Sequence, residues 1–249
     1  MKRIILLFAA AACSLMSASA QQNVSSGKMP DRQYKSVRLS VQGGYAYRTS
    51  KVNRSGKLLY GDYAEKMKEG ISYGADATWY FSKSFGVGIK YSAFRSDTPT
   101  DYMSITNIDE SQNQEGSESP SWQTISGRVE NHVSIWFLGP LVSYRLITRN
   151  MRHSFIMDIG IGYMGYKDNV IRINPYVRKG GSPGFVYEIG YDFNISRTVA
   201  VGAMATYGFG IMSKYRTKLS DGWHNTTLER GFRENLNHVN LSVGLRIYL

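Results

Sequence analysis

The chain ends in the stretch VNLSVGLRIYL, residues 239–249, and this stretch decides the fold. Apolar side chains occupy every second position, while Asn240, Ser242, Gly244, Arg246 and Tyr248 stand between them. Successive side chains of a β-strand point to opposite faces, so a strand with this sequence has one apolar face and one mostly polar face. The end of the chain is therefore predicted to be a strand that separates two different environments.

Seven further segments repeat this alternation, which predicts eight strands. They cover residues 37–47, 71–81, 85–93, 133–146, 155–163, 185–193 and 199–209. In the fourth segment, the apolar positions 133, 135 and 137 are followed by Gly139 and Pro140, after which the pattern resumes one residue out of phase at Val142. Proline cannot donate a hydrogen bond to a ladder, so a β-bulge is expected at this point.

The connections between these segments alternate between short and long. Short ones cover residues 82–84, 147–153 and 194–198, and long ones cover about 48–69, 95–127, 167–183 and 211–235. Loops of that length are unusual inside a compact soluble domain, whereas membrane barrels combine tight turns at one end with long loops at the other. The segments are also long enough for a tilted strand to cross a bilayer.

Aromatic residues at the apolar positions fall into two belts when the chain is traced up and down. One belt lies toward the long loops and the other toward the short turns, with an aliphatic band between them; the belts include Tyr45, Tyr73, Tyr91, Tyr163, Tyr187 and Tyr207, and Trp79 and Tyr144, respectively. Lipid interfaces select such girdles. We therefore expect an all-β fold, an eight-stranded antiparallel transmembrane β-barrel with an up-and-down meander, short periplasmic turns and four long extracellular loops.

The first residues have the layout of a cleavable signal peptide. Lys2 and Arg3 precede an apolar run at 4–12, and small residues at 17–20 offer a cleavage site. We expect a signal peptide at 1–20, a short periplasmic segment at 21–35 and a barrel domain at 36–249. Lipoprotein processing at Cys13 is the competing interpretation. The net charge of +11 favours an anionic neighbour, and export argues against nucleic acid.

The C-terminus resembles the β-signal of outer-membrane barrels, on Ser242, Gly244, Ile247 and the final Leu249, where phenylalanine is usual. Together with the alternation, it is similar to the small bacterial outer-membrane β-barrel family that includes OmpA-like and OmpX-like proteins and the Bacteroidetes "porin family". The resemblance implies a cell outer membrane location in a Gram-negative envelope and recognition by the barrel assembly machinery.

Charged residues lie at alternate positions that should face the lumen. Eight strands leave a lumen that side chains can fill, so inward charges are expected to pair. Phe81 opposite Phe85 places Asp76 opposite Lys90, which predicts an ion pair between them. The same logic predicts a set of lumen ion pairs and a polar plug, formed by Asp76, Lys90, Arg38, Arg145, Asp158, Glu188, Asp192 and Arg246.

A hydrolase site is the sharpest enzymatic alternative. Glu130, His132 and Ser134 supply the residue types of a nucleophilic site, and they resemble the strand-borne His and Ser of outer-membrane lipid A deacylases. His132 and Ser134 share the expected inward face, which would point them away from a lipid substrate. No enzyme activity, cofactor or metal site is predicted.

The function expected is a structural or surface-interaction role with a largely closed lumen. Expected partners are outer-membrane lipid and lipopolysaccharide, the assembly machinery, and an extracellular or envelope protein. Three long connections (48–69, 167–183 and 211–235) are net basic and could contact lipopolysaccharide phosphates, whereas 95–127 is acidic. The alternatives are a narrow channel for small or hydrophobic solutes, similar to OmpW, and a lipid-modifying enzyme.

Overall fold

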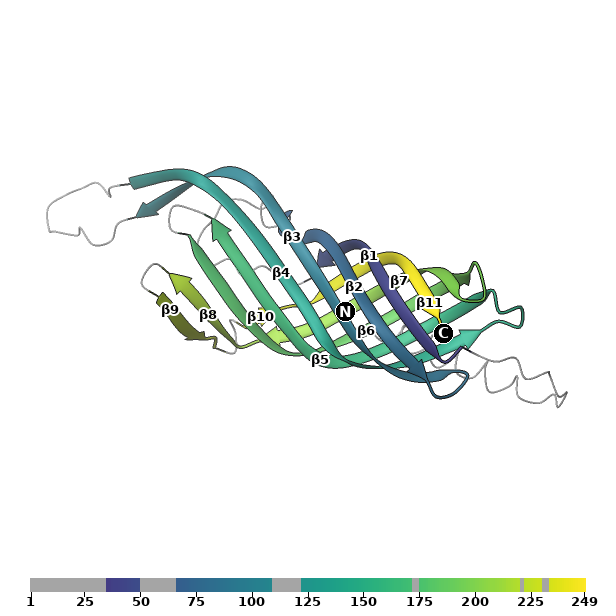
Figure 1. Ribbon diagram of the computed structural model, residues 1–249. Helices are drawn as coiled ribbons and strands as arrows, with labels where there is room; N and C mark the ends of the chain where they lie inside the picture. The colour runs from purple at the N-terminus through teal and green to yellow at the C-terminus, as the bar shows by residue number, and fades with distance from the viewer. Residues whose placement is uncertain (1–34, 50–65, 109–121, 172–174, 220–221, 230–232) are drawn as a thin grey trace, which may run out of the picture. The chain divides into compact units, whose positions relative to one another are not determined.

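A computed structural model describes residues 35–49, 66–108, 122–171, 175–219, 222–229 and 233–249. The expected signal peptide, the Cys13 alternative and nearly all of the expected periplasmic segment lie outside these residues. The barrel wall consists of eight strands: β1 (Val37–Arg48), β2 (Glu69–Tyr80), β3 (Phe85–Ile108), β4 (Trp122–Ile147), β5 (His153–Ile171), β6 (Tyr176–Asn194), β7 (Val199–Met212) and β11 (His238–Tyr248) (Figure 1).

The barrel closes because the last wall strand pairs with the first. β11 is antiparallel to both β1 and β7, with Leu245 opposite Val41 on one side and Val201 on the other. Every other wall strand pairs with its sequence neighbour, and no crossover intervenes among the described strands. The predicted eight-stranded meander is confirmed. We call the end with the tight connections after β2, β4 and β6 the turn end, and the opposite end the loop end.

Side chains alternate between the lumen and the outer surface along each wall strand. β7 alternates exposed and buried residues along its whole length, with Val201 and Ala203 outside and Met204 and Thr206 inside. Large apolar side chains remain exposed on the outer surface, including Val41 at 59% and Val243 at 66%. A soluble protein would cover such a surface. Among the described residues, no helix is both long and apolar enough to cross a membrane.

The expected bulge in β4 is wrong. The β3–β4 ladder runs through Gly139 and Pro140 without a shift, and the β4–β5 ladder loses its pairing there but resumes in the same register. Proline therefore removes a hydrogen bond without changing the phase. Consequently Val133, Ile135 and Phe137 face the lumen, where each side chain is at most 1% exposed. The register shift that the structure does contain lies in β3, between Thr98 and Asp101.

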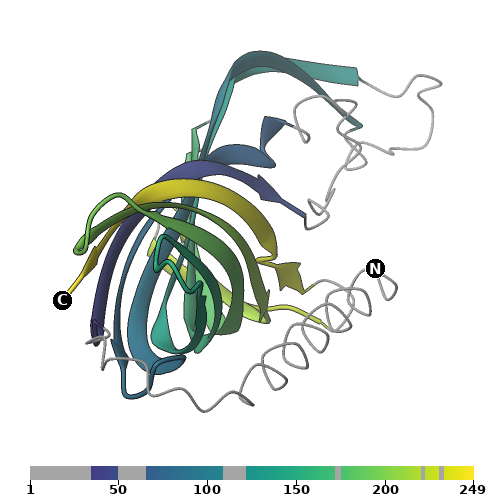
Figure 2. The ribbon, with the colours of Figure 1, turned by 90° about the vertical axis from the view of Figure 1, so that its right-hand side faces the viewer.

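Several predicted loops are largely strand. β3 and β4 continue as a paired ribbon up to Ile108 and down from Trp122, and β5 and β6 pair as far as Val170 and Tyr176 (Figures 1 and 2). The connection after β7 forms the hairpin β8 (Lys214–Leu219) and β9 (Gly222–Thr227), and then β10 (Glu234–Asn235). β8 replaces β7 as the neighbour of β6 at the loop end.

Candidate functional site: the barrel lumen

The turn-end half of the lumen contains a layer of buried charges. The structure places all eight predicted lumen residues inside, each at most 5% exposed. Four are cationic and four anionic, so their formal charges cancel. We call this set the charged layer; it consists of Arg38, Lys90, Arg145 and Arg246 with Asp76, Asp158, Glu188 and Asp192. An isolated charge in such surroundings is costly, and pairing within the layer lowers that cost.

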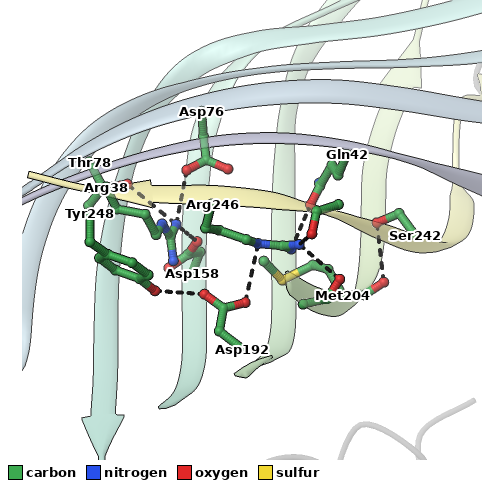
Figure 3. Close-up of polar contacts among 12 residues, drawn as sticks. Arg38, Gln42, Asp76, Thr78, Asp158, Asp192, Met204, Ser242, Arg246 and Tyr248 are labelled. Carbon is green, nitrogen blue, oxygen red and sulfur yellow. Dashed lines mark hydrogen bonds and ion pairs between the residues drawn. The ribbon is translucent and has the colours of Figure 1, made fainter. Parts of the chain in front are cut away.

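Arg38 joins two strands from opposite sides of the barrel wall. Its Nη2 atom lies 3.0 Å from Asp76 Oδ2 on β2 and 2.7 Å from Asp158 Oδ2 on β5 (Figure 3). The same nitrogen is 3.4 Å from the hydroxyl of Thr78. One guanidinium therefore holds together strands that share no ladder, and it does so across the lumen.

Lys90 has a different partner from the expected one. The register prediction is correct, since Asp76 and Lys90 are opposite each other in the β2–β3 ladder. However, Lys90 Nζ lies 2.9 Å from Glu188 Oε2 on β6, while Asp76 pairs with Arg38. Lys90 and Glu188 form an ion pair without a directional hydrogen bond between these two atoms. A long side chain reaches across a narrow lumen as easily as along a hairpin, so strand register alone does not fix the partner.

Asp192 connects the last strand to β6. Arg246 Nε is 3.2 Å from Asp192 Oδ1, and the Tyr248 hydroxyl donates to Asp192 Oδ2 at 2.6 Å (Figure 3). Gly202 makes room for this contact, because a Cβ atom added there would lie 2.0 Å from Asp192 Oδ1. The strand that closes the barrel thus contributes Arg246 to the charged layer and the Tyr248 hydroxyl as a hydrogen-bond partner of that layer.

Arg145 covers the turn end of the charged layer. Its guanidinium carbon lies 3.6 Å from the centroid of the Tyr80 ring, a cation–π contact. It donates hydrogen bonds to the carbonyl oxygens of Lys83 at 3.1 Å and Lys35 at 2.7 Å. This cation is therefore held by an aromatic face and by backbone oxygens, and it connects the lumen to the turn after β2.

An apolar layer fills the lumen above the charged layer. Its centre is a cluster of buried side chains from six wall strands and from the segment before β11, which we call the apolar layer: Ala46, Phe94, Val133, Ile135, Phe137, Met164, Val186, Met212 and Leu236. His238 stacks on Phe94 with their ring centroids 5.9 Å apart. The sequence prediction missed this layer, because its β4 members were assigned to the outer face.

A second polar cluster lies at the loop end of the lumen. Arg48 Nη2 is 2.6 Å from Glu234 Oε1 and also donates to the carbonyl of Asn235 at 3.1 Å. Asp168 accepts hydrogen bonds from Asn131 at 3.3 Å and Tyr166 at 3.4 Å. The short strand β10 is thereby attached to the first wall strand, and the apolar layer has polar side chains on both sides.

The His132–Ser134 pair does not form a nucleophilic site, and its predicted orientation is wrong. Both residues lie on the face of β4 that points outward, opposite in phase to Val133 and Ile135. His132 Nδ1 is 2.6 Å from Asp97 Oδ1, and its Nε2 is 3.2 Å from Glu130 Oε1. With both ring nitrogens at carboxylates, neither serves as a base toward Ser134. No cluster that could hold a metal ion occurs within the described residues.

The C-terminal residues lie where the barrel closes. Leu249 exchanges backbone hydrogen bonds with Val37, of 2.8 and 3.0 Å. Ile247 and Leu249 face outward, and Ser242 faces the lumen, where its hydroxyl donates to the Met204 carbonyl at 3.4 Å. A Cβ atom on Gly244 would lie 2.1 Å from the carbonyl oxygen of Val41. The glycine therefore allows close approach of β11 to β1.

The predicted girdle aromatics all lie on the outer surface. Tyr45, Trp79 and Tyr163 are about half exposed, at 51%, 55% and 49%. Neighbouring rings pack against each other in tilted pairs along the surface, as in Phe85 with Tyr144 at 4.9 Å and Trp136 with Tyr163 at 5.5 Å between centroids. The exterior is therefore apolar between two aromatic bands, which together with the closed wall defines the class of transmembrane β-barrels.

No protein-family model matches the chain, and no curated protein is similar to it in sequence. Solved outer-membrane barrels are similar in structure. Neisserial surface protein A has 12% identity and a TM-score of 0.47, over 86% of this chain and 97% of that one. OprG from Pseudomonas aeruginosa has 11% identity and a TM-score of 0.45, over 87% and 97%. Ail of Yersinia pestis, in complex with the heparin analogue sucrose octasulfate, has 15% identity and a TM-score of 0.41, over 85% of this chain and 99% of that one.

Proposed function

We propose that this protein is a cell outer membrane barrel with a closed lumen, which acts through its outer surface and its loop end. The observation that carries the proposal is the filling of the lumen by two successive layers of opposite chemistry. The charged layer has no excess charge to attract an ion, and the apolar layer above it offers no partner for a hydrated one. Barrels of eight strands leave little interior space beyond their own side chains.

Single-channel recording in planar bilayers tests the closed lumen. The refolded full-length chain is expected to give current at background level over a wide voltage range. A variant in which Phe94, Ile135 and Phe137 are all replaced by serine provides the matched control, because it hydrates the apolar layer without touching the charged layer. Steady unit currents from the unmodified protein would overturn the proposal in favour of a narrow channel.

The outer membrane location rests on the exterior and on the end of the chain. Exposed aliphatic residues lie between aromatic bands, and the C-terminal strand has the outward residues Ile247 and Leu249 at its tip. We propose that the assembly machinery recognises this strand. Removal of residues 247–249 should leave the chain in the periplasm, whereas Leu249→Phe should assemble normally in a membrane-fractionation assay. Normal assembly of the shortened chain would contradict the assignment.

The proposed partners follow from the exposed surface. Membrane lipid contacts the apolar band, and anionic headgroups or an extracellular or envelope protein contact the loop end. No enzymatic step is proposed, because both ring nitrogens of the candidate base His132 lie at the carboxylates of Asp97 and Glu130. The role supported best is a structural or surface-interaction role, at the cell surface.

A further inference from the structure

A row of cations crosses the outer surface at the loop end. Lys167 on β5 is opposite Lys179 on β6, and Lys179 is opposite Arg216 on β8. We call these three residues the outer basic row. Lys214 and Lys218 flank Arg216 on the same face of β8, because residues two apart on a strand point the same way. All five side chains are exposed. Five cations from three adjacent strands thus share one patch.

The charges of the outer basic row are not neutralised within the described part of the chain. The ion pairs among the described residues involve other cations. No described carboxylate lies within 4.0 Å of Lys167, Lys179 or Arg216. Like charges opposite each other destabilise a sheet. Arg95 extends the row beyond Ser134, but it is paired with Asp97 at 3.1 Å. The remaining row therefore favours an external anion.

Trp223 orders two cations of the row. Lys179 Nζ lies 5.5 Å and the Arg216 guanidinium carbon 5.7 Å from the centroid of its ring. Trp223 is on β9, opposite Lys218, and its side chain is 47% exposed. Cation–π contacts of this kind hold flexible side chains in place while the charged ends stay accessible. The patch is thus partly organised before any ligand arrives.

The position of the row relative to the membrane identifies the ligand class. Lys167 lies on the same face of β5 as the girdle residue Tyr163 and four positions beyond it, roughly 13 Å along the strand. Lys179 lies on the same face of β6 as Phe185, on the loop side. The cations therefore continue the lipid-facing surface into the layer where headgroups begin, and they face sideways toward neighbouring lipids.

We propose that the outer basic row binds the phosphate groups of a phosphorylated glycolipid in the surrounding outer leaflet. Several lysine and arginine donors within reach of one another suit a headgroup that carries more than one phosphate. This inference rests on the proposed outer membrane location and names the lipid partner of that surface. It does not depend on whether the lumen is closed.

Lipid retention tests the proposal. The full-length protein is reconstituted into phosphatidylcholine vesicles that contain bisphosphorylated lipid A, transferred to a mild detergent, and analysed by native mass spectrometry for bound lipid A. The test variant is Lys167→Ala/Lys179→Ala/Arg216→Ala. The control is Arg149→Ala/Arg152→Ala/Arg197→Ala, which loses the same charge at three exposed turn-end positions. Heat-modifiable migration on gels verifies folding of both.

The unmodified barrel and the control are expected to retain at least about fivefold more lipid A than the test variant, because charge-assisted phosphate contacts are lost only in the latter. Dephosphorylated lipid A should be retained poorly by all three. Equal retention by the test variant, or equal retention of the dephosphorylated lipid, would overturn the proposal. So would row-dependent binding of soluble heparin with unchanged lipid A retention, which would identify a soluble polyanion. Neither result bears on the current measured in the bilayer test.

Discussion

The two halves of the lumen contrast in their chemistry. The turn-end half is filled by four cations and four anions, while the layer above it, below the polar cluster of the loop end, is filled by aromatic, aliphatic and thioether side chains. Both halves face the same enclosed space and lie on the same strands. The charged layer is held by specific pairs, so it should respond strongly to loss of one partner. The apolar layer is held by packing, so it should respond in proportion to the volume removed.

The comparison also explains how the barrel stays closed. Paired charges on strands from opposite sides, such as Arg38 with Asp158, tie the wall together across the lumen. Apolar side chains exclude the water that would otherwise hydrate and weaken those pairs. Each layer therefore supports the other, and the following predictions separate their contributions.

The largest effect is expected from Arg38→Ala. This change leaves Asp76 and Asp158 buried without their shared cation, which should lower the free energy of unfolding by about 3–5 kcal/mol. Reversible urea unfolding in lipid vesicles measures it. Arg152→Ala, at an exposed turn position, is the control and should have little effect. Similar stability of the two variants would show that the charged layer is hydrated rather than paired.

Phe137→Ala tests the apolar layer. Truncation of this ring, which is 1% exposed, should cost about 3 kcal/mol through lost burial and the cavity left behind. Leu138→Ala removes a neighbouring side chain that faces outward and is 46% exposed, so it should cost less in the same assay. A larger loss of stability for Leu138→Ala than for Phe137→Ala would indicate that Phe137 faces the lipid instead of the lumen.

A double-mutant cycle distinguishes the partners of Lys90. Lys90→Ala and Glu188→Ala should show a coupling of about 1–3 kcal/mol, because the two side chains contact each other across the lumen. The cycle of Lys90→Ala with Asp76→Ala is the control and should couple more weakly, although the two residues are opposite in the ladder. Stronger coupling to Asp76 would mean that the pair along the hairpin forms after all.

The smallest effect is expected from Ser134→Leu. This residue faces outward on β4, so an apolar side chain there should change the stability by no more than about 0.5 kcal/mol. Ile135→Ser, one position away and fully buried, should cost at least about 2 kcal/mol. If Ile135→Ser left the stability unchanged while Ser134→Leu lowered it, Ser134 would face the lumen and Ile135 the lipid.

Residues 239–249 show how far sequence reasoning reaches. Strict alternation assigned each side chain of this strand to a face, and the register Leu245 opposite Val41 places those faces as expected. β4 shows where it fails. Apolar side chains occur at both parities around Phe137, so the pattern fitted two phases, and the choice of a bulge at Pro140 selected the wrong one. The long connections were predicted as loops, although they are largely strand. Strands whose outer face is polar lack the alternation of apolar residues by which the other strands were recognised.

By itself, the sequence determined the barrel, the number of its strands, and the inward direction of the eight side chains of the charged layer, because each of these follows from period-two alternation and from turn spacing along one strand or hairpin. It did not point to the buried Arg48 and Asp168 at the loop end. Only the tertiary structure decided which charges pair, where the apolar layer lies, and that Lys167, Lys179 and Arg216 form one row. These depend on contacts between strands that are distant in the sequence and on how the barrel closes, and alternation within a strand carries no information about what lies across the lumen.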